Sequence, residues 1–358
     1  MRKKCLWLVC VCTVLLNVSC GNKAEGDIEA ETASGVVLVQ NQSFYEVELS
    51  NGESLYFSGF DDSGNLQGLA TDKDSVAVAT SYGTGFIVSA DGEMVTNAHV
   101  VSNLVADKDV NKSVDKVLKA LKTLLSAKYY ELEEKYRQAN QYYQYARYSD
   151  DVSYEDFYRV KAICEAIESE RDECLEYYNA IDNIRATDSE IKYHNTVSIA
   201  YNNTHVTNAG DFVPCVVTKT DNEHDLALIQ LKSKATPEGK YIFAVPEEDP
   251  LKEYSLMDKV TKEVREDKNS RLFMTGFNLG PALAITKEGV KSQFNTGTIS
   301  QRTDDRLMYS IPALPGSSGS PVVNHAGELV AVNYAGLNGT QSFNYGVRVK
   351  HLRNLLKR

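Results

Sequence analysis

Cysteine is scarce in this chain, and its spacing argues against both a disulfide framework and a zinc site. Of seven cysteines, only Cys164, Cys174 and Cys215 lie beyond residue 20. If Cys164 and Cys174 share a helix, ten residues separate them by about 15 Å, which is too far for a disulfide. No Cys-x-x-Cys or Cys/His spacing typical of zinc ligands occurs. We therefore expect these three cysteines to be small buried hydrophobic residues, and we predict no metal and no cofactor.

Positive charge is also in deficit. The chain has 38 Lys and Arg against 49 Asp and Glu, a formal net charge of −11. Without the first 20 residues, which include Arg2, Lys3 and Lys4, 35 basic side chains face 49 acidic ones, a net charge near −14. Such a surface repels phosphates, so nucleic acids and anionic lipid surfaces are disfavoured as partners.

The apolar run at the N-terminus, Cys5–Leu16, is too short for a permanent membrane span. Because Arg2-Lys3-Lys4 precedes it, residues 1–20 are typical of an export signal. Asn17-Val18-Ser19-Cys20-Gly21 resembles a loose bacterial lipobox, so we predict lipidation at Cys20 and a flexible tether over 21–34. The protein is then anchored in the bacterial cell envelope, facing the periplasm or the cell surface. The alternative is ordinary signal cleavage and a freely soluble exported protein.

Glycine and proline are absent from residues 104–193. Apolar residues there follow three-four spacing in two series, beginning at Val114 and at Phe157. The turn is predicted at 149–152, and Ser153 with Asp156 forms a capping pair. The pattern predicts an antiparallel coiled-coil hairpin, whose two halves carry net charges of +3 (107–149) and −8 (150–192).

The function of this inserted hairpin is left open between two interpretations. Twelve of the 21 tyrosines lie in it. Tyrosine is favoured at interfaces, so the hairpin could recruit a protein partner, guide substrate or mediate self-association. Alternatively, it is a solvated insertion whose tyrosines pack against one another.

Three short segments carry residues that acyl transfer by serine requires. They contain His99 in Thr96-Asn97-Ala98-His99, Asp225 before Leu226-Ala227-Leu228, and Ser318 in Gly316-Ser317-Ser318-Gly319-Ser320-Pro321. A serine hydroxyl needs an imidazole to take its proton, and the imidazole needs a carboxylate to fix its tautomer. The sequence therefore predicts His99 as general base, Asp225 as its partner and Ser318 as nucleophile.

Neighbouring serines and histidines are alternative candidates. Ser317 and Ser320 are interpreted as small turn residues. His224 adjoins Asp225, but adjacent strand residues point to opposite faces. We expect His224, like the remaining histidines His194, His205, His325 and His351, to be an ordinary surface or loop residue.

These segments, together with Gly83-Thr84-Gly85-Phe86, Gly297-Thr298-Ile299-Ser300 and Asn344-Tyr345-Gly346-Val347, resemble the trypsin-like serine proteases of the bacterial HtrA type. Only Ser318 has glycine two residues before it and glycine directly after it, as that family's nucleophile does. The resemblance covers roughly residues 75–103 and 195–358. Ser320 departs from the family, which more often has glycine there.

Short apolar runs separated by turn residues flank the helical segment and are typical of β-barrels. Together with the resemblance, they predict a mainly β fold of two six-stranded antiparallel barrels, with the helical hairpin inserted between His99 and Asp225. The protease domain would comprise 35–103 and 194–358, and the insertion 104–193. The chain ends at Arg358, so we expect no PDZ domain.

The function implied is hydrolysis of peptide bonds in a protein or peptide substrate through an acyl-enzyme. The N–H groups of Gly316 and Ser318 would form the oxyanion hole. By similarity, the specificity pocket has its base near Pro312 and one wall at Asn333-Tyr334-Ala335, and without an acidic base it favours small or aliphatic side chains. The alternative is a catalytically silent or latent binding protein of the same fold that acts through its helical hairpin.

Overall fold

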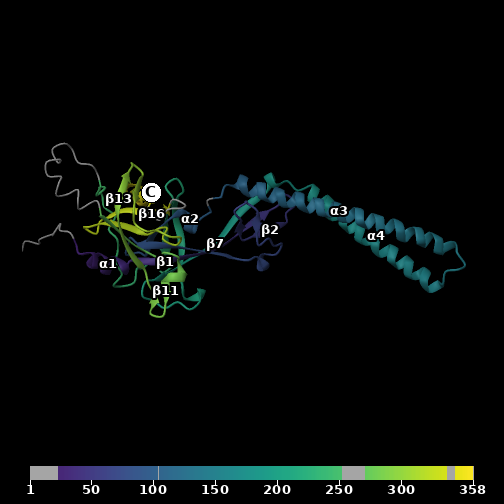
Figure 1. The fold of residues 1–358 in the computed structure, drawn as a ribbon, viewed down its shortest axis with the longest axis horizontal. Coiled ribbons are helices and arrows are strands. Elements are labelled where there is room, and N and C mark those ends of the chain that lie inside the picture. The colour runs from purple at the N-terminus through teal and green to yellow at the C-terminus, as the bar shows by residue number, and fades with distance from the viewer. Residues whose placement is uncertain (1–22, 104, 252–270, 337–342, 358) are drawn as a thin grey trace, which may run out of the picture.

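Two closed antiparallel β-barrels form the body of the molecule (Figure 1). The computed structural model describes residues 23–103, 105–251, 271–336 and 343–357. The first barrel runs in the order β1 (Val36–Glu48), β5 (Ala79–Ile87), β6 (Glu93–Thr96), β9 (Leu226–Leu231), β8 (Val213–Asp221) and β7 (Glu190–Tyr201), and β1–β7 pairing closes it. The second runs in the order β10 (Arg271–Gly276), β13 (Gln293–Arg302), β14 (Arg306–Tyr309), β17 (Asn344–Arg348), β16 (Leu329–Gly336) and β15 (Pro321–Asn324), and β10–β15 pairing closes it.

The predicted fold of two six-stranded barrels is confirmed. Apolar, often β-branched side chains fill the barrels, as in β9, where every residue except Gln230 is buried. Short elements complete the described fold. They are β2 (Ser54–Phe57), β3 (Gly59–Phe60), β4 (Leu66–Gln67), β11 (Ile285–Thr286), β12 (Gly289–Val290), α2 (Ala98–Val101), α6 (Pro281–Ala284) and 3-10 turns at Lys73–Ser75, Ala186–Asp188 and Ala209–Asp211.

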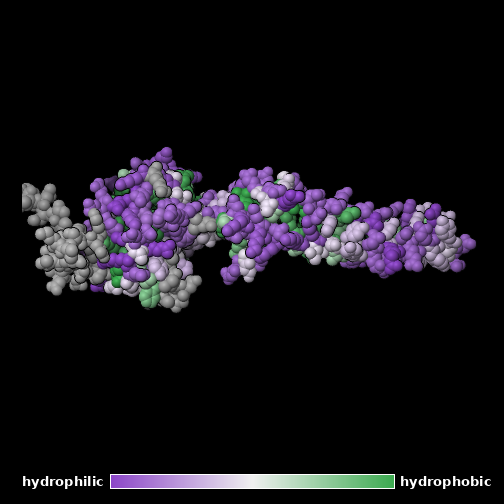
Figure 2. All heavy atoms as spheres, turned by 90° about the horizontal axis from the view of Figure 1, so that it is seen from above, coloured by the Kyte–Doolittle hydropathy of each residue, from purple (hydrophilic) through white to green (hydrophobic). Residues whose placement is uncertain are grey.

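The inserted hairpin is a long helical arm formed by α3 (Asp107–Tyr148) and α4 (Tyr154–Asp182), which projects from the barrels (Figure 1). The predicted cap is confirmed, because Ser153 Oγ accepts a hydrogen bond from the N–H of Asp156 at 3.1 Å. Ion pairs link the two helices, as their opposite charges suggest. They are Lys122–Asp182 at 2.8 Å, Lys128–Glu170 at 2.9 Å and Arg171–Glu133 at 3.2 Å. The exposed surface of the arm is largely hydrophilic (Figure 2).

The base of the arm has a hydrophobic core of its own, which the sequence did not predict. β1 and β7 pair along their whole length, beyond the barrel, and β2 extends this sheet. Tyr45, Val47 and Phe57 from the sheet pack with Val110 and Leu118 of α3. The predicted boundary at 193/194 therefore falls inside β7, because a strand can continue from the barrel into the base of the arm.

The prediction of a flexible tether is wrong for most of its length. Residues Glu25–Ala33 form helix α1. Ile28 on this helix is completely buried in a core shared by both barrels, and Thr32 Oγ1 lies 3.0 Å from Thr275 Oγ1 of β10. Glu25 also pairs with Arg271 at 2.6 Å. Ile28 is the one large apolar residue of this helix, among charged and small ones, so the sequence shows no apolar periodicity and did not indicate that the helix docks.

The C-terminal helix α7 (Val349–Lys357) packs against both barrels, with Val349, Leu352 and Leu355 buried. From the first barrel, Lys219 Nζ donates to the backbone carbonyls of Leu355 and Leu356 at the end of this helix. Across the described residues, none of the helices combines the length and apolar character that a membrane crossing requires. Signal residues 1–20, with Cys20, lie outside the described part.

Candidate active site

His99 and Asp225 meet in the first barrel, although 126 positions separate them. His99 lies on α2, directly after β6, and Asp225 lies in the turn between β8 and β9. Asp225 Oδ2 is 2.6 Å from His99 Nδ1, and Asp225 Oδ1 accepts a hydrogen bond from the His99 N–H at 2.9 Å. Because the carboxylate contacts both the ring and the backbone of His99, Nδ1 carries the proton and Nε2 remains as a proton acceptor.

The turn that presents Asp225 has an uncommon backbone conformation. Asp225 has φ of 53°, in the left-handed region that aspartate tolerates better than most residues. Asn97 Nδ2 donates to the Asp225 carbonyl at 2.7 Å. Asn97 is completely buried and immediately precedes α2, so the hydrogen bond links the two backbone segments that carry His99 and Asp225.

Ser318 lies in the loop before β15 of the second barrel, and the first barrel holds this loop in place. Thr84 of β5 donates its N–H to the Ser318 carbonyl at 2.7 Å and its Oγ1 to the Gly316 carbonyl at 2.8 Å. Gly319 donates its N–H to the Asn333 carbonyl at 2.7 Å. Thr84 has no exposed surface, so these bonds are shielded from water. The sequence motif containing Thr84 was noted, but its role was not.

Two glycines of this loop cannot be replaced without rearrangement. Gly316 has φ of 97° and Gly319 has φ of 89°. A Cβ on Gly316 would lie 2.5 Å from the Phe277 carbonyl oxygen, and one on Gly319 would lie 2.0 Å from the Thr84 carbonyl oxygen. Both the torsion and the contacts therefore require glycine.

The backbone N–H groups of Gly316 and Ser318 meet no hydrogen-bond acceptor among the described residues. Two such donors in one glycine-containing turn have the chemistry of an oxyanion hole. By contrast, Ser317 and Ser320 are buried turn residues, as predicted. Ser317 Oγ donates to the Leu314 carbonyl and Ser320 Oγ to the Ser317 carbonyl, each at 2.7 Å.

The Ser318 side chain is only partly buried, and its Oγ lies 3.5 Å from the Tyr334 carbonyl oxygen. Among the described contacts, none is a hydrogen bond between Ser318 Oγ and His99. A rotation about the Ser318 Cα–Cβ bond, which has three staggered minima, can redirect the hydroxyl. The structure thus contains a formed His99–Asp225 pair and a serine turned toward Tyr334.

Asn333 was predicted in the wall of a specificity pocket. Its side chain instead holds the Ser318 loop through a hydrogen bond. Its side chain is 1% exposed. Asn333 Nδ2 donates to the Ser317 carbonyl at 3.0 Å, and Oδ1 accepts from the Tyr309 hydroxyl at 2.8 Å. The prediction is wrong for this side chain, since strand alternation turns it into the barrel. Pro312 is exposed, and the Ala335 side chain lies outside the described part.

A cleft of about 510 Å³ lies beside Asp225. It is lined by Glu223, His224, Asp225, Thr303, Asp305, Arg306, Tyr334 and Val347. The Arg306 guanidinium lies 5.4 Å from the centre of the Tyr334 ring. Burial raises the pKa of the Tyr334 hydroxyl, so this phenol stays uncharged around neutral pH.

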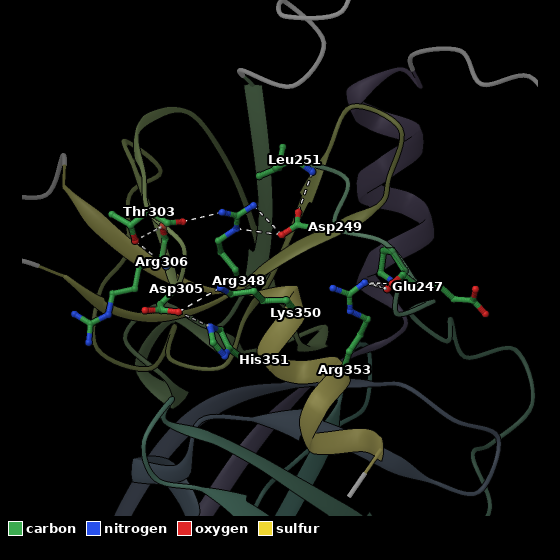
Figure 3. A network of polar contacts seen from close by, with 11 residues as sticks. Glu247, Asp249, Leu251, Thr303, Asp305, Arg306, Arg348, Lys350, His351 and Arg353 are labelled. Carbon is green, nitrogen blue, oxygen red and sulfur yellow. Dashed lines mark hydrogen bonds and ion pairs between the residues drawn. The ribbon is translucent and has the colours of Figure 1, made fainter. Parts of the chain in front are cut away.

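His351 is not the surface or loop residue that was expected, because it is buried on helix α7 (Figure 3). His351 is 7% exposed, and its ring stacks on that of His224 with centroids 3.7 Å apart. Burial and the neighbouring His224 lower the pKa of His351. His224 Nδ1 lies 3.0 Å from Asp221 Oδ2, so the ring pairs with Asp221 rather than taking the place of His99.

Comparison with known proteins gives a match for part of the chain. Residues 184–332 match the model of the trypsin-like peptidase domain, a region that includes Asp225 and Ser318 but not His99. No curated protein matches the sequence.

Solved structures also resemble the chain. The serine endoprotease from Yersinia pestis has 11% identity and a TM-score of 0.43, with 94% of this chain and 66% of that chain covered. The HtrA-type protease AlgW with decapeptide has 12% identity and a TM-score of 0.45, with the same coverage. AlgW with tripeptide has 11% identity and a TM-score of 0.43, with 94% and 63% covered. The chain thus spans slightly less than two thirds of the length of these structures.

Proposed function

We propose that the chain is a serine endopeptidase that acts through His99, Asp225 and Ser318, since residues 184–332 match the model of the trypsin-like peptidase domain. The observation that carries the proposal is the two-point contact of Asp225 with His99, at 2.9 Å to its backbone and 2.6 Å to its ring. A surface histidine does not need both contacts. The two contacts are useful where one ring nitrogen must be kept unprotonated, ready to accept a proton, and where the imidazolium that then forms must be stabilised.

In the proposed mechanism, Ser318 Oγ turns from Tyr334 to His99 Nε2, loses its proton to it and attacks the substrate carbonyl carbon. The N–H groups of Gly316 and Ser318 stabilise the oxyanion. His99 then gives the proton to the leaving amine, and the acyl-enzyme forms. Water, activated by His99, releases the second product by the same route. Each step uses a group that the described contacts hold on one of the two barrels.

The activity can be tested by incubating the purified protein with an unfolded model protein and measuring new amino termini. We expect hydrolysis by the wild-type chain and by Ser300→Ala, since Ser300 is an exposed residue of β13. We expect none by Ser318→Ala. Equal hydrolysis by Ser318→Ala would reject Ser318 as the nucleophile. Absence of hydrolysis by a folded wild-type protein would favour the silent or latent binding protein.

We further propose that the protein is exported and carries a lipid at Cys20, which would hold it in the cell envelope. The support is in the sequence alone, in the charged and apolar segments before Cys20. Metabolic labelling with a fatty-acid analogue tests this proposal. Label on the wild-type chain and none on Cys20→Ser is the expected result, and equal labelling of both would contradict it.

The helical arm is proposed as a site for a protein partner or for self-association. Several tyrosines near its turn are widely exposed, including Tyr148 at 79% and Tyr154 at 84%. Tyrosines that only stabilised the hairpin would be packed between its helices, as Tyr143 is, with its ring stacked on Phe157 at 5.4 Å. Sedimentation measurements on the wild type and on Tyr148→Ser/Tyr154→Ser test the self-association form. A smaller assembly of the variant is expected, and unchanged sedimentation would contradict it.

A further inference from the structure

Helix α2, which carries His99, is a single turn of four residues, Ala98–Val101. So short a helix is unstable by itself, because the hydrogen bonds of one turn do not offset the entropy lost in ordering it. Contacts from outside α2 therefore decide where His99 lies. At its N-terminal end, Asp225 accepts the hydrogen bond from the His99 N–H. The carbonyl groups at its C-terminal end have no partner within the helix and need one elsewhere.

Asn195 of β7 supplies that partner. Its Nδ2 donates to the Val101 carbonyl at 2.7 Å and to Asn41 Oδ1 at 3.2 Å. Asn41 of β1 is 2% exposed, and its own Nδ2 donates to the Tyr193 hydroxyl at 3.0 Å. Both partners of the Asn195 amide nitrogen are thus acceptors, so the position requires a side chain with two N–H donors.

A second hydrogen bond holds the chain two residues after Val101. Tyr45 of β1 donates its hydroxyl to Asn103 Oδ1 at 2.9 Å. The Tyr45 ring belongs to the hydrophobic core at the base of the arm, where it stacks on Phe57 with centroids 4.8 Å apart. The segment that follows α2 is therefore bound to the two strands, β1 and β7, that continue from the first barrel into the arm (Figure 1).

We propose that Asn195 is a positioning residue for His99, because it holds the end of α2 on β1 and β7 and so keeps the His99 ring on Asp225. The inference rests on the proposed function, in which His99 transfers the proton of Ser318. Asn195 acts through the backbone of α2, since its hydrogen bond goes to the Val101 carbonyl, two residues after His99.

The apolar contacts of α2 do not replace this hydrogen bond. Val100 and Val101 are buried and pack in the core of the first barrel. Apolar burial has no preferred direction, however, so it allows a one-turn helix to rotate or slide slightly. The 2.6 Å contact between His99 Nδ1 and Asp225 Oδ2 tolerates little movement, because hydrogen bonds weaken steeply when they are misaligned.

Two variants of Asn195 test the proposal by kinetics. Asn195→Asp keeps the size of the side chain but places a carboxylate against two acceptor oxygens, and Asn195→Ala removes both donors. We expect kcat for a peptide substrate to fall at least about tenfold in each, with KM unchanged, since misplacement by about 1 Å can cost roughly 100-fold. Thr196→Ala, at the exposed neighbour that points to the other face of β7, is the matched control and should retain the wild-type kcat.

Nuclear magnetic resonance gives a readout that does not depend on hydrolysis. In protein labelled with ¹⁵N-histidine, the His99 Nδ1 proton that contacts Asp225 should give a far-downfield signal, assigned by its loss in His99→Gln. We expect this proton to exchange with water about tenfold faster in Asn195→Asp, the equivalent of one net hydrogen bond. Its exchange should be unchanged in Thr196→Ala.

Circular dichroism and urea midpoints identify the folded variants, and Asn195 is an exposed residue, so its replacement carries little risk to the fold. In folded Asn195→Asp or Asn195→Ala, either an unchanged kcat or an unchanged exchange rate would overturn the proposal. Absence of the downfield signal from the folded wild type would overturn it too. A wild type that gives the signal but hydrolyses no substrate would reject the proposed function alone, and faster exchange in Asn195→Asp would still support the positioning of His99 by Asn195.

Discussion

At the scale of single residues, the central contact is that of Asp225 with His99. Asp225→Asn retains the shape of the side chain, but an amide can present its N–H to His99 Nδ1 and so favour the wrong tautomer. We expect kcat to fall by about 10⁴-fold, as the same change does in other Ser-His-Asp sites. The measurement is hydrolysis of a peptide substrate under saturating conditions, beside a circular-dichroism spectrum.

Asp62→Asn, in the exposed turn between β3 and β4, is the matched control and should leave kcat unchanged. A loss of less than tenfold in Asp225→Asn, in a folded protein, would mean that Asp225 does not set the tautomer of His99.

The residues of the site divide into those that a local motif indicates and those that only packing reveals. His99, Asp225 and Ser318 each stand in a short segment with recognisable neighbours. Asn333 could not be placed in this way, because its partners Tyr309 and Ser317 come from other segments. The stacked pair of His224 and His351 was missed for the same reason, since 127 positions separate them.

At the scale of elements, helix α1 is part of the body formed by the two barrels. Ile28 is completely buried, so Ile28→Ala removes apolar surface and leaves a cavity. We expect the free energy of unfolding to fall by about 2–5 kcal/mol. Urea denaturation of the wild type and the variant measures this difference.

Ile163→Ala provides the control for the Ile28 experiment. Ile163 lies on α4 and is 47% exposed, so its truncation should change the free energy of unfolding by roughly 0.5 kcal/mol or less. If Ile28→Ala lowered the free energy of unfolding as little as Ile163→Ala does, α1 would not be docked in solution, and the prediction of a flexible tether over 21–34 would stand.

Some helices and strands could be predicted from sequence patterns alone, and others could not. Apolar three-four spacing without glycine or proline predicted α3 and α4, and short apolar runs predicted the barrels. The tether was misjudged because one buried side chain, Ile28, docks a helix that is otherwise polar. The base of the arm was missed because pairing of β1 with β7 brings together segments about 150 residues apart.

For the whole molecule, buried tyrosines predict loss of stability in alkali. Burial raises the pKa of Tyr45 and of Tyr201 to about 12, from about 10 in an unfolded chain. Between these values the folded chain retains protons that the unfolded chain loses. The stabilisation is therefore complete below about pH 10 and is lost as the pH rises through about 12.

Urea midpoints measured in steps from pH 9 to about 12 test this dependence, with tyrosinate absorbance as a second signal. Tyr201→Phe should reduce the slope, because its ring is kept and its ionisable group is removed. A flat stability profile over this range, or an unchanged slope in Tyr201→Phe, would contradict the prediction.

The arrangement of the two barrels carries the main claim. Thr84 of the first barrel binds the Ser318 loop of the second, and the first barrel also holds His99 and Asp225. The three side chains can act together only if this junction persists in solution and Ser318 turns from Tyr334 toward His99. Reactivity of Ser318 reports on both conditions.

The most direct measurement is labelling of the purified protein with a fluorophosphonate probe, which reacts with a serine activated by its base. The account predicts that the wild type and the exposed-serine control Ser300→Ala are labelled and that Ser318→Ala is not. Absence of label on the folded wild type, or equal labelling of Ser318→Ala, would contradict it.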